Sequence, residues 1–236
     1  MYYILHTENN NIYINFNTIK CNSGLLNQIN IDVNNFIYRI VFLQKKIHIN
    51  IWNDYYIRIV IFNMCGELIL SDRYRVLNSR TIKKFNLEVN SDFISCACVL
   101  GDIKFLEWWK NSGLPLEYDE SALSIASREG QVNVLDWWLK SNLPLKYDED
   151  ALKSASWYGH IHVLEWWKNS GLELKYDETA IDFTAMNGHL DVLKWWKNSG
   201  LPLKYTGDAL QNAIEGNQYD FIILMKNYGL LPNVDI

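Results

Sequence analysis

The chain has 236 residues, of which 49% are hydrophobic and 21% are charged; this balance allows a sizeable core and excludes a compositionally disordered protein. No apolar run reaches the roughly 18 residues that a membrane-spanning helix needs, and the first residues lack the basic and apolar zones of a secretory signal. We therefore expect a cytoplasmic protein. Cys21, Cys65, Cys96 and Cys98 are too scattered for a disulfide framework and lack zinc-site spacing, so no metal or cofactor is expected.

The formal net charge of −5 at pH 7 is unevenly distributed. Residues 1–86 carry 10 Lys and Arg against 5 Asp and Glu, whereas residues 87–236 carry 12 against 22. Opposite charge on the two segments indicates two domains, and the acidic segment would repel a phosphate backbone. We expect neither nucleic acid nor membrane as a ligand, and favour a protein partner with a basic or mixed surface.

Residues 1–78 are predicted to form a strand-rich N-terminal domain. Alternating and β-branched runs recur there between polar breaks that favour turns. These runs cover residues 2–6, 11–16, 36–43, 46–52, 55–62 and 67–70. We expect a small sheet ahead of the helical segment, so the predicted fold class is α+β.

The pattern becomes helical near residue 79, and a Trp-Trp pair then recurs every 29 residues. The pairs are Trp108-Trp109, Trp137-Trp138, Trp166-Trp167 and Trp195-Trp196. A fixed period of this length is typical of a solenoid, in which each unit buries its apolar face against the next. An aromatic ligand platform is one interpretation. Because each pair takes apolar positions of a helix, we favour core packing with an indole edge reaching solvent.

Each unit of the repeat domain, residues 79–236, is predicted to contain two short helices. Ser121, Asp150, Thr179 and Asp208 share the slot before the first helix and are the expected N-caps. Gly130, Gly159 and Gly188 end the first helix, and Gly113, Asn142, Gly171 and Gly200 end the second. We predict about five helix pairs, with atypical units at both ends and a half-unit near Thr81–Phe85.

The unit that begins at Thr179 resembles the ankyrin repeat. Its sequence, Thr179-Ala-Ile-x-x-x-Ala-x-Asn-Gly188-His189-Leu-Asp-Val-Leu-Lys-Trp-Trp-x-x-x-Gly200, matches that family in the cap, the Gly-His pair and the apolar positions. The period is 29 residues where ankyrin repeats have about 33, Ala replaces Pro, and Trp-Trp replaces the leucine pair. The resemblance implies an all-α ankyrin-like solenoid whose projecting hairpin is shortened to a tight turn at Tyr-Asp-Glu.

The Asn-, Ile-, Tyr- and Lys-rich composition also looks like that of ankyrin proteins encoded by giant viruses of amoebae. The segment Tyr56–Val76 is similar to a leader domain found in some of them. This resemblance implies a viral protein that binds a host protein in the host cytoplasm.

Positions that vary between repeats are free to contact a partner, and two slots at the end of each first helix vary most. In ankyrin proteins these slots line the concave binding face, and adjacent aromatics at an exposed slot are typical of interface hot spots. The alternative for Trp157 and Tyr158 is packing on the N-terminal domain or on the shortened turn. The predicted partner-binding residues are Arg128, Glu129, Trp157, Tyr158, Met186, Asn187 and Glu215.

No catalytic arrangement is recognisable in the repeats. The sequence contains no glycine-rich phosphate loop or triad order, and we interpret His160 and His189 as packing and capping residues. We predict a noncatalytic protein–protein interaction module rather than an enzyme. Two alternatives stay open: an effector with enzymatic activity in residues 1–78, and an adaptor whose basic leader docks one protein while the repeats bind another.

Overall fold

The computed structural model describes residues 2–6, 28–33, 36–42, 56–62, 68–70, 74–85 and 87–231, with side chains at 74–84 and 87–231. The chain forms two compact units. The first comprises residues 1–96 and 104–117, and the second comprises residues 97–103 and 118–236. The second unit contains the seven site residues predicted from the sequence.

The strands of the first unit pair antiparallel in the order β2-β3-β1-β4-β5, and β6 also pairs with β4. Their bounds are β1 Tyr2–His6, β2 Gln28–Val33, β3 Phe36–Phe42, β4 Tyr56–Phe62, β5 Leu68–Leu70 and β6 Tyr74–Arg75. The central strand β1 sets the register, because Ile4 lies opposite Ile40 of β3 and Arg58 of β4.

The predicted fold class, α+β with a strand-rich N-terminal domain, is wrong. Where side chains are described, the chain is helical apart from the two-residue strand β6. A domain requires a buried core, and the strands β1 to β5 are described by their backbone alone, so they do not support a domain of their own. The strands predicted at 11–16 and 46–52 lie outside the described residues. The fold class of the part with described side chains is all-α.

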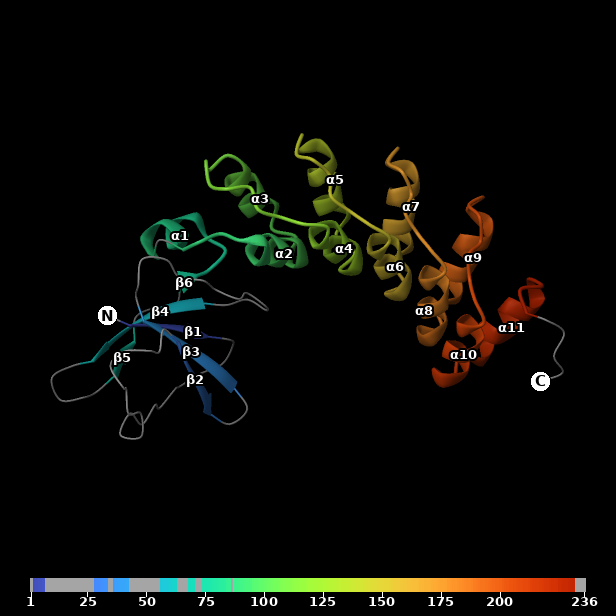
Figure 1. Cartoon of the computed structure of the whole chain (residues 1–236), viewed down its shortest axis with the longest axis horizontal. Coiled ribbons are helices and arrows are strands. Elements are labelled where there is room, and N and C mark those ends of the chain that lie inside the picture. The colour runs from blue at the N-terminus through green and yellow to red at the C-terminus, as the bar shows by residue number, and fades with distance from the viewer. Residues whose placement is uncertain are drawn as a thin grey trace. The chain divides into compact units, whose positions relative to one another are not determined.

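Helix α1 (Ser79–Phe85) precedes five helix pairs in the described part of the chain. The pairs are α2 (Ser91–Leu100) with α3 (Ile103–Lys110), α4 (Ser121–Arg128) with α5 (Val132–Lys140), α6 (Asp150–Trp157) with α7 (Ile161–Asn169), α8 (Thr179–Asn187) with α9 (Leu190–Asn198), and α10 (Asp208–Glu215) with α11 (Tyr219–Asn227). The predicted half-unit and number of pairs are confirmed. In the second unit the first helices α4, α6, α8 and α10 form one row and the second helices α5, α7, α9 and α11 form another (Figure 1).

Residues with left-handed backbone angles end the helices where the sequence predicts. Gly130, Gly159 and Gly188 follow the first helices with φ of 69°, 75° and 66°. Asn142 (φ 61°) and Asn217 (φ 56°) hold the same conformation at slots where the other repeats have Gly. Asn is the commonest residue besides Gly to accept this conformation, so the substitutions preserve the helix ends.

The predicted N-cap slot is wrong by two residues. Asp150 and Asp208 are the first residues of α6 and α10, as Ser121 and Thr179 are of α4 and α8. The capping oxygen belongs to the residue two positions earlier: Asp148 Oδ1 accepts from the Asp150 N–H at 3.1 Å, and Asp119, Asp177 and Thr206 do the same in the other repeats. Because Glu149 already has helical angles (φ −63°, ψ −23°), the capping position shifts back into the Tyr-Asp-Glu turn.

The second indole of each Trp pair occupies the core. Trp109, Trp138, Trp167 and Trp196 are 0% exposed. The first indole is half-buried in three pairs and buried in the fourth. In α7, for example, the two rings meet edge to face with centroids 5.1 Å apart. Each buried indole contributes about 2 to 3 kcal/mol from removal of apolar surface, so the prediction that the pairs are core is confirmed.

Extended segments join the repeats in place of projecting hairpins. Residues 144–148, 173–177 and 202–206 contain neither helix nor strand. The turn tyrosine ties each segment to the next, as when the Tyr147 hydroxyl donates to the Glu173 carbonyl at 3.1 Å while its ring packs 5.0 Å from that of Trp167. A single turn residue, at 149, 178 and 207, separates each extended segment from the next helix; the comparison with the ankyrin finger stays a prediction. Among the described helices, none has the length and apolarity to cross a membrane.

Candidate protein-interaction surface

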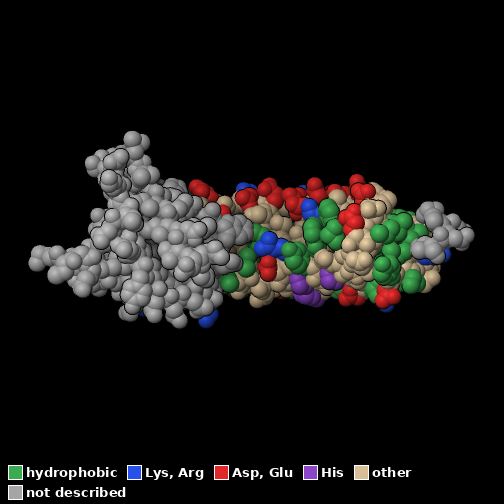
Figure 2. Space-filling model, turned by 90° about the horizontal axis from the view of Figure 1, so that it is seen from below, with side chains coloured by type: hydrophobic (Ala, Val, Ile, Leu, Met, Phe, Trp, Pro, Cys, Tyr) green, Lys and Arg blue, Asp and Glu red, His purple; other side chains and the backbone are tan. Residues whose placement is uncertain are grey.

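The exposed side of α4, α6, α8 and α10 is termed the first-helix face. Figure 2 views the molecule from the side on which these helices lie in Figure 1. Acidic side chains follow one edge of the view, and apolar side chains gather toward its C-terminal half (Figure 2). The surface therefore combines a charged edge with apolar area.

All seven predicted site residues lie at the C-terminal ends of the first helices. They are Arg128 and Glu129 at the end of α4, Trp157 and Tyr158 at α6, Met186 and Asn187 at α8, and Glu215 at α10. The second residue of each pair is exposed, as is Glu215, while Arg128, Trp157 and Met186 are half-buried. Because successive first helices pack on one another, these residues form one row across the repeats.

An aromatic cluster occupies the middle of this row. The Trp157 ring stacks on Phe183 of α8, with centroids 4.9 Å apart and planes 26° apart. On its own helix it lies 6.3 Å from the Tyr158 ring at 25°. Tyr158 leaves 52% of its surface exposed, so the aromatic cluster of Trp157, Tyr158 and Phe183 is anchored on one side and open on the other.

Phe183 belongs to the aromatic cluster but is not among the residues predicted from the sequence. Its slot in the other described repeats holds Cys96, Ile125, Ser154 and Asn212, so it varies between repeats as much as the predicted slots do. That variation is the signal that was overlooked. Trp157 thus packs on the neighbouring repeat through Phe183, and the alternative packing on the shortened turn does not account for its stacking.

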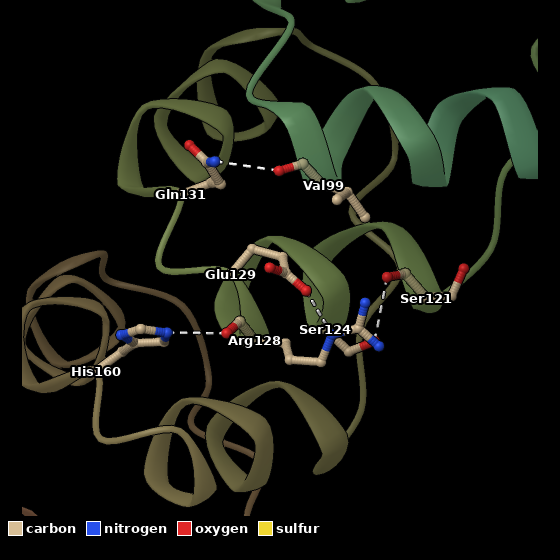
Figure 3. A network of polar contacts seen from close by, with 7 residues as sticks. All are labelled: Val99, Ser121, Ser124, Arg128, Glu129, Gln131 and His160. Atoms are coloured by element: carbon tan, nitrogen blue, oxygen red, sulfur yellow. Dashed lines mark hydrogen bonds and ion pairs between the residues drawn. The ribbon is translucent and has the colours of Figure 1, made fainter. Parts of the chain in front are cut away.

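Side chains from the following repeat hold the backbone of the row in place. His160 Nε2 donates to the carbonyl of Arg128 at 2.9 Å, and Gln131 Nε2 donates to the carbonyl of Val99 at 3.1 Å (Figure 3). Gln218 reaches the Met186 carbonyl in the same way at 3.3 Å. The last carbonyls of a helix have no partner within it, so these bonds satisfy them. The predicted structural role of His160 is confirmed through this bond to the preceding repeat, but its side chain does not cap its own helix α7.

The repeat between these two uses a different donor for the same purpose. Asn187 Nδ2 donates to the carbonyl of Trp157 at 2.9 Å. A predicted site residue of α8 thereby fixes the backbone of the aromatic cluster on α6. The row is a preformed surface whose helix ends are crosslinked from one repeat to the next.

Arg128 and Glu129 form an exposed ion pair on the same row. Arg128 Nε lies 2.8 Å from Glu129 Oε1, and both side chains keep about a third of their surface in solvent (Figure 3). Exposed pairs of this kind contribute little to stability, at most about 1 kcal/mol. Both groups therefore stay accessible to charged groups of a partner.

Carboxylates gather at the opposite ends of the first helices. The exposed ones in the turns and first helical positions are Asp119, Glu120, Glu149, Glu178 and Asp208. Negative charge at a helix N-terminus is favoured by the helix dipole, which accounts for their placement within each repeat. Figure 2 shows acidic side chains along one edge of the view.

Asp182 of α8 is buried and serves the fold. Its carboxylate accepts from the Thr206 N–H at 2.9 Å and from the Thr206 hydroxyl at 2.7 Å. Burial raises the pKa of the Asp182 carboxyl, and the two hydrogen bonds from Thr206 oppose this shift. Thr206 occupies the slot that holds Asp in the other turns, and a carboxylate there would repel that of Asp182.

The described side chains contain no group of three or more His, Cys, Asp and Glu residues placed to hold a metal ion. Cys96 and Cys98 are buried in α2. What the first-helix face offers chemically is aromatic area, an open ion pair and an acidic edge on a rigid backbone.

Comparison of the sequence with protein-family models and with curated proteins finds no match in either. The repeat geometry and the side chains of the first-helix face are therefore the grounds for assigning a function.

Proposed function

We propose that this chain is a noncatalytic interaction module of the ankyrin-like type, which binds a protein partner on the first-helix face. The aromatic cluster carries this proposal. Trp157 and Phe183 fix the position of the ring stack, and Tyr158 presents half of its surface to solvent. Tyr and Trp are enriched among the residues that dominate binding energy at interfaces, because they bury much area at little entropic cost.

The rigidity of the row supports this function. Hydrogen bonds from His160, Asn187 and Gln218 hold the ends of three successive first helices. A surface that is already ordered loses little conformational entropy on association, so more of the contact energy appears as affinity.

The acidic edge indicates the partner's charge. Residues 118–231 carry 16 Asp and Glu against 10 Lys and Arg, and the exposed carboxylates of the turns lie on the same helices as the aromatic cluster. A partner with a basic or mixed surface would be steered toward this face and held in register on it. The partner we propose presents apolar side chains to Tyr158 and basic ones to the acidic edge.

Tyr158→Ala is the sharpest test, because it removes the exposed ring and leaves the stacked pair in place. Full-length wild type and variant would be used to capture proteins from host-cell extract, with quantification by mass spectrometry. Loss of a hot spot costs about 2 kcal/mol or more, so we expect the captured partner to bind about 30-fold more weakly. The melting temperature should stay unchanged.

Lys168→Ala is the matched control. Lys168 is exposed on α7, in the row of second helices, and its removal should leave capture unchanged. Equal recovery of every captured protein by wild type and Tyr158→Ala would refute binding through the aromatic cluster. Loss of capture by Lys168→Ala as well would assign the interaction to the other row of helices.

A further inference from the structure

One exposed slot at the end of each first helix changes its chemistry from repeat to repeat. In steps of 29 residues, this outer slot holds Leu100, Glu129, Tyr158 and Asn187, and all four side chains are exposed. Leu100 keeps 40% of its surface in solvent and Tyr158 keeps 52%. Along the row, the outer slots therefore alternate apolar, acidic, apolar and amide side chains, with one in each repeat.

The outer slots of successive repeats lie side by side. The carbonyls of Val99, Arg128 and Trp157, each one residue before an outer slot, all accept a hydrogen bond from a side chain of the following repeat. Figure 3 shows two of these bonds, which join the end of α2 to the start of α5 and the end of α4 to the start of α7. Packed helices lie about 8 to 10 Å apart. A ligand that contacts every outer slot must therefore present one side chain for each step of that length.

Of the regular backbone conformations, polyproline II matches this step. It has about three residues per turn and a rise of about 3.1 Å per residue, so every third side chain returns to the same side after about 9 Å. A β-strand returns to the same side after about 7 Å, and an α-helix after about 5 Å. A strand or helix would thus direct further side chains at the surface between two slots, whereas polyproline II places one in each.

The aromatic cluster favours the same conformation. The rings of Trp157 and Tyr158 lie 6.3 Å apart with planes at 25°, and the Tyr158 ring is open to solvent. Aromatic surfaces of this kind bind proline-rich segments, because proline is flat and apolar and a polyproline II segment is ordered before it binds.

Glu129 lies between the two apolar outer slots and selects a positive charge. Its Oε1 accepts from Arg128 Nε at 2.8 Å. An ionised carboxylate has about four acceptor positions, so Glu129 can receive a second cation while it keeps this bond. A basic side chain of the ligand would then complement the carboxylate that the structure leaves exposed.

We infer that the partner contacts the first-helix face through a polyproline II segment, an inference that rests on the proposed function and specifies its ligand. A basic residue of the segment meets Glu129, and apolar residues three positions to either side meet Leu100 and Tyr158. Because the apolar positions are symmetric about the basic one, the segment can run along the row in either direction.

The test uses the peptide Leu-Pro-Pro-Arg-Pro-Pro-Leu, which reads the same in both directions. The labelled peptide is titrated with the full-length protein and followed by fluorescence anisotropy. Leu-Ala-Ala-Arg-Ala-Ala-Leu keeps the spacing but loses the rigid conformation, so we expect it to bind at least about 10-fold more weakly. A wild type that does not bind the proline peptide at up to about 1 mM protein, or that binds both peptides equally, overturns the inference.

Protein variants test the contacts with the same peptide. Tyr158→Ala should weaken binding about 30-fold, and Glu129→Gln about 5-fold. Glu120→Gln is the matched control, because it removes an equal charge from an exposed residue at the other end of α4; it should leave binding unchanged. Equal weakening by Glu129→Gln and Glu120→Gln would show general attraction to the acidic surface and overturn the assigned position of the basic residue.

A competition assay separates this inference from the proposed function. Excess proline peptide should displace the protein that wild type captures from extract. Capture that Tyr158→Ala abolishes but the peptide does not displace overturns the polyproline II segment and leaves the proposed function standing. Peptide binding that Tyr158→Ala leaves unchanged overturns the inference, because the aromatic cluster then takes no part in it.

Discussion

The interior of the repeats and the ends of their first helices follow opposite rules. The second indole of each pair is the same residue in four repeats and is 0% exposed in all of them. The row that includes Trp157 and Met186 changes at every repeat and is half-buried or exposed. Interior positions are constrained by neighbours on every side, whereas the residues of the row keep part of their surface in solvent, even where Trp157 stacks on Phe183. Constancy among the repeats therefore marks the buried framework, and variation marks the exposed positions.

Interior positions constrain one another in pairs, each made of an indole N–H and the side chain in the preceding repeat that accepts its hydrogen bond. Trp196 needs the hydroxyl of Ser156, which lies 40 residues earlier, and where Met225 replaces the indole the corresponding residue is Ala185. A buried indole N–H without an acceptor costs about 1 to 3 kcal/mol. A single change within such a pair is penalised, which keeps the interior uniform.

The largest expected effect is on the indole layer. Trp167→Ala removes a ring that packs on Trp166 and Tyr147 and leaves a cavity beside Ser127. We expect the free energy of unfolding to fall by about 3 to 5 kcal/mol, measured by urea denaturation followed by circular dichroism. Trp166→Ala, which truncates the half-buried indole beside it, should lose clearly less. Equal losses of unfolding free energy would contradict the distinction between a fully buried indole in the core and a half-buried indole at its edge.

A smaller effect is expected for the acceptor alone. Ser156→Ala leaves the buried Trp196 N–H without its partner at 3.0 Å, so unfolding should become easier by about 1 to 3 kcal/mol. Ser154→Ala on the same helix is the control, because Ser154 is half-buried and the gain in helix propensity is the same. If both variants unfold at the same urea concentration, the hydrogen bond does not hold the repeats together.

Because the turn tyrosines are partly buried, we predict that the stability of the repeats depends on pH. Burial raises the pKa of Tyr118, Tyr147 and Tyr176 above the ordinary value of 10.0. Above about pH 10 the unfolded chain therefore binds fewer protons than the folded one, and the free energy of unfolding falls as pH rises toward the folded pKa values. The melting temperature should accordingly drop between about pH 9 and pH 11. Tyr147→Phe should reduce that drop, and a flat profile would contradict a stabilising role for the buried turn tyrosines.

The smallest expected effect on stability is at the surface. Tyr158→Ala should change the free energy of unfolding by no more than about 0.5 kcal/mol, while it weakens capture of the partner. The contrast with Trp167→Ala is the clearest measure of the difference between the two regions.

Features set by local backbone chemistry were predictable from single segments. The residues with positive φ were found because Gly and Asn accept that conformation at a helix end. The N-cap slot was misplaced because Glu149 adopts helical angles one residue earlier than expected. The fold class was wrong because alternating runs predicted a strand-rich domain, whereas the part of the chain with described side chains is helical apart from β6.

Contacts between repeats could not be read from one segment. Phe183 was missed because it meets Trp157 across 26 residues of chain, and nothing around Phe183 itself marks the contact. The exposure of Ile214 and Ile223 was equally hidden, since helical spacing alone treats an isoleucine as core.

By itself the sequence determined the 29-residue period, the two helices in each repeat and the residues that end them, because these depend on sterics within a few residues of chain. Only the tertiary structure decided which indole of a pair is fully buried, which side chain accepts its N–H, and which aromatic side chains reach the surface. These outcomes depend on contacts with the neighbouring repeat. Ile214 shows this most directly. The equivalent residues of earlier repeats, Ser127 and Ser156, are 0% exposed, whereas Ile214 is 50% exposed.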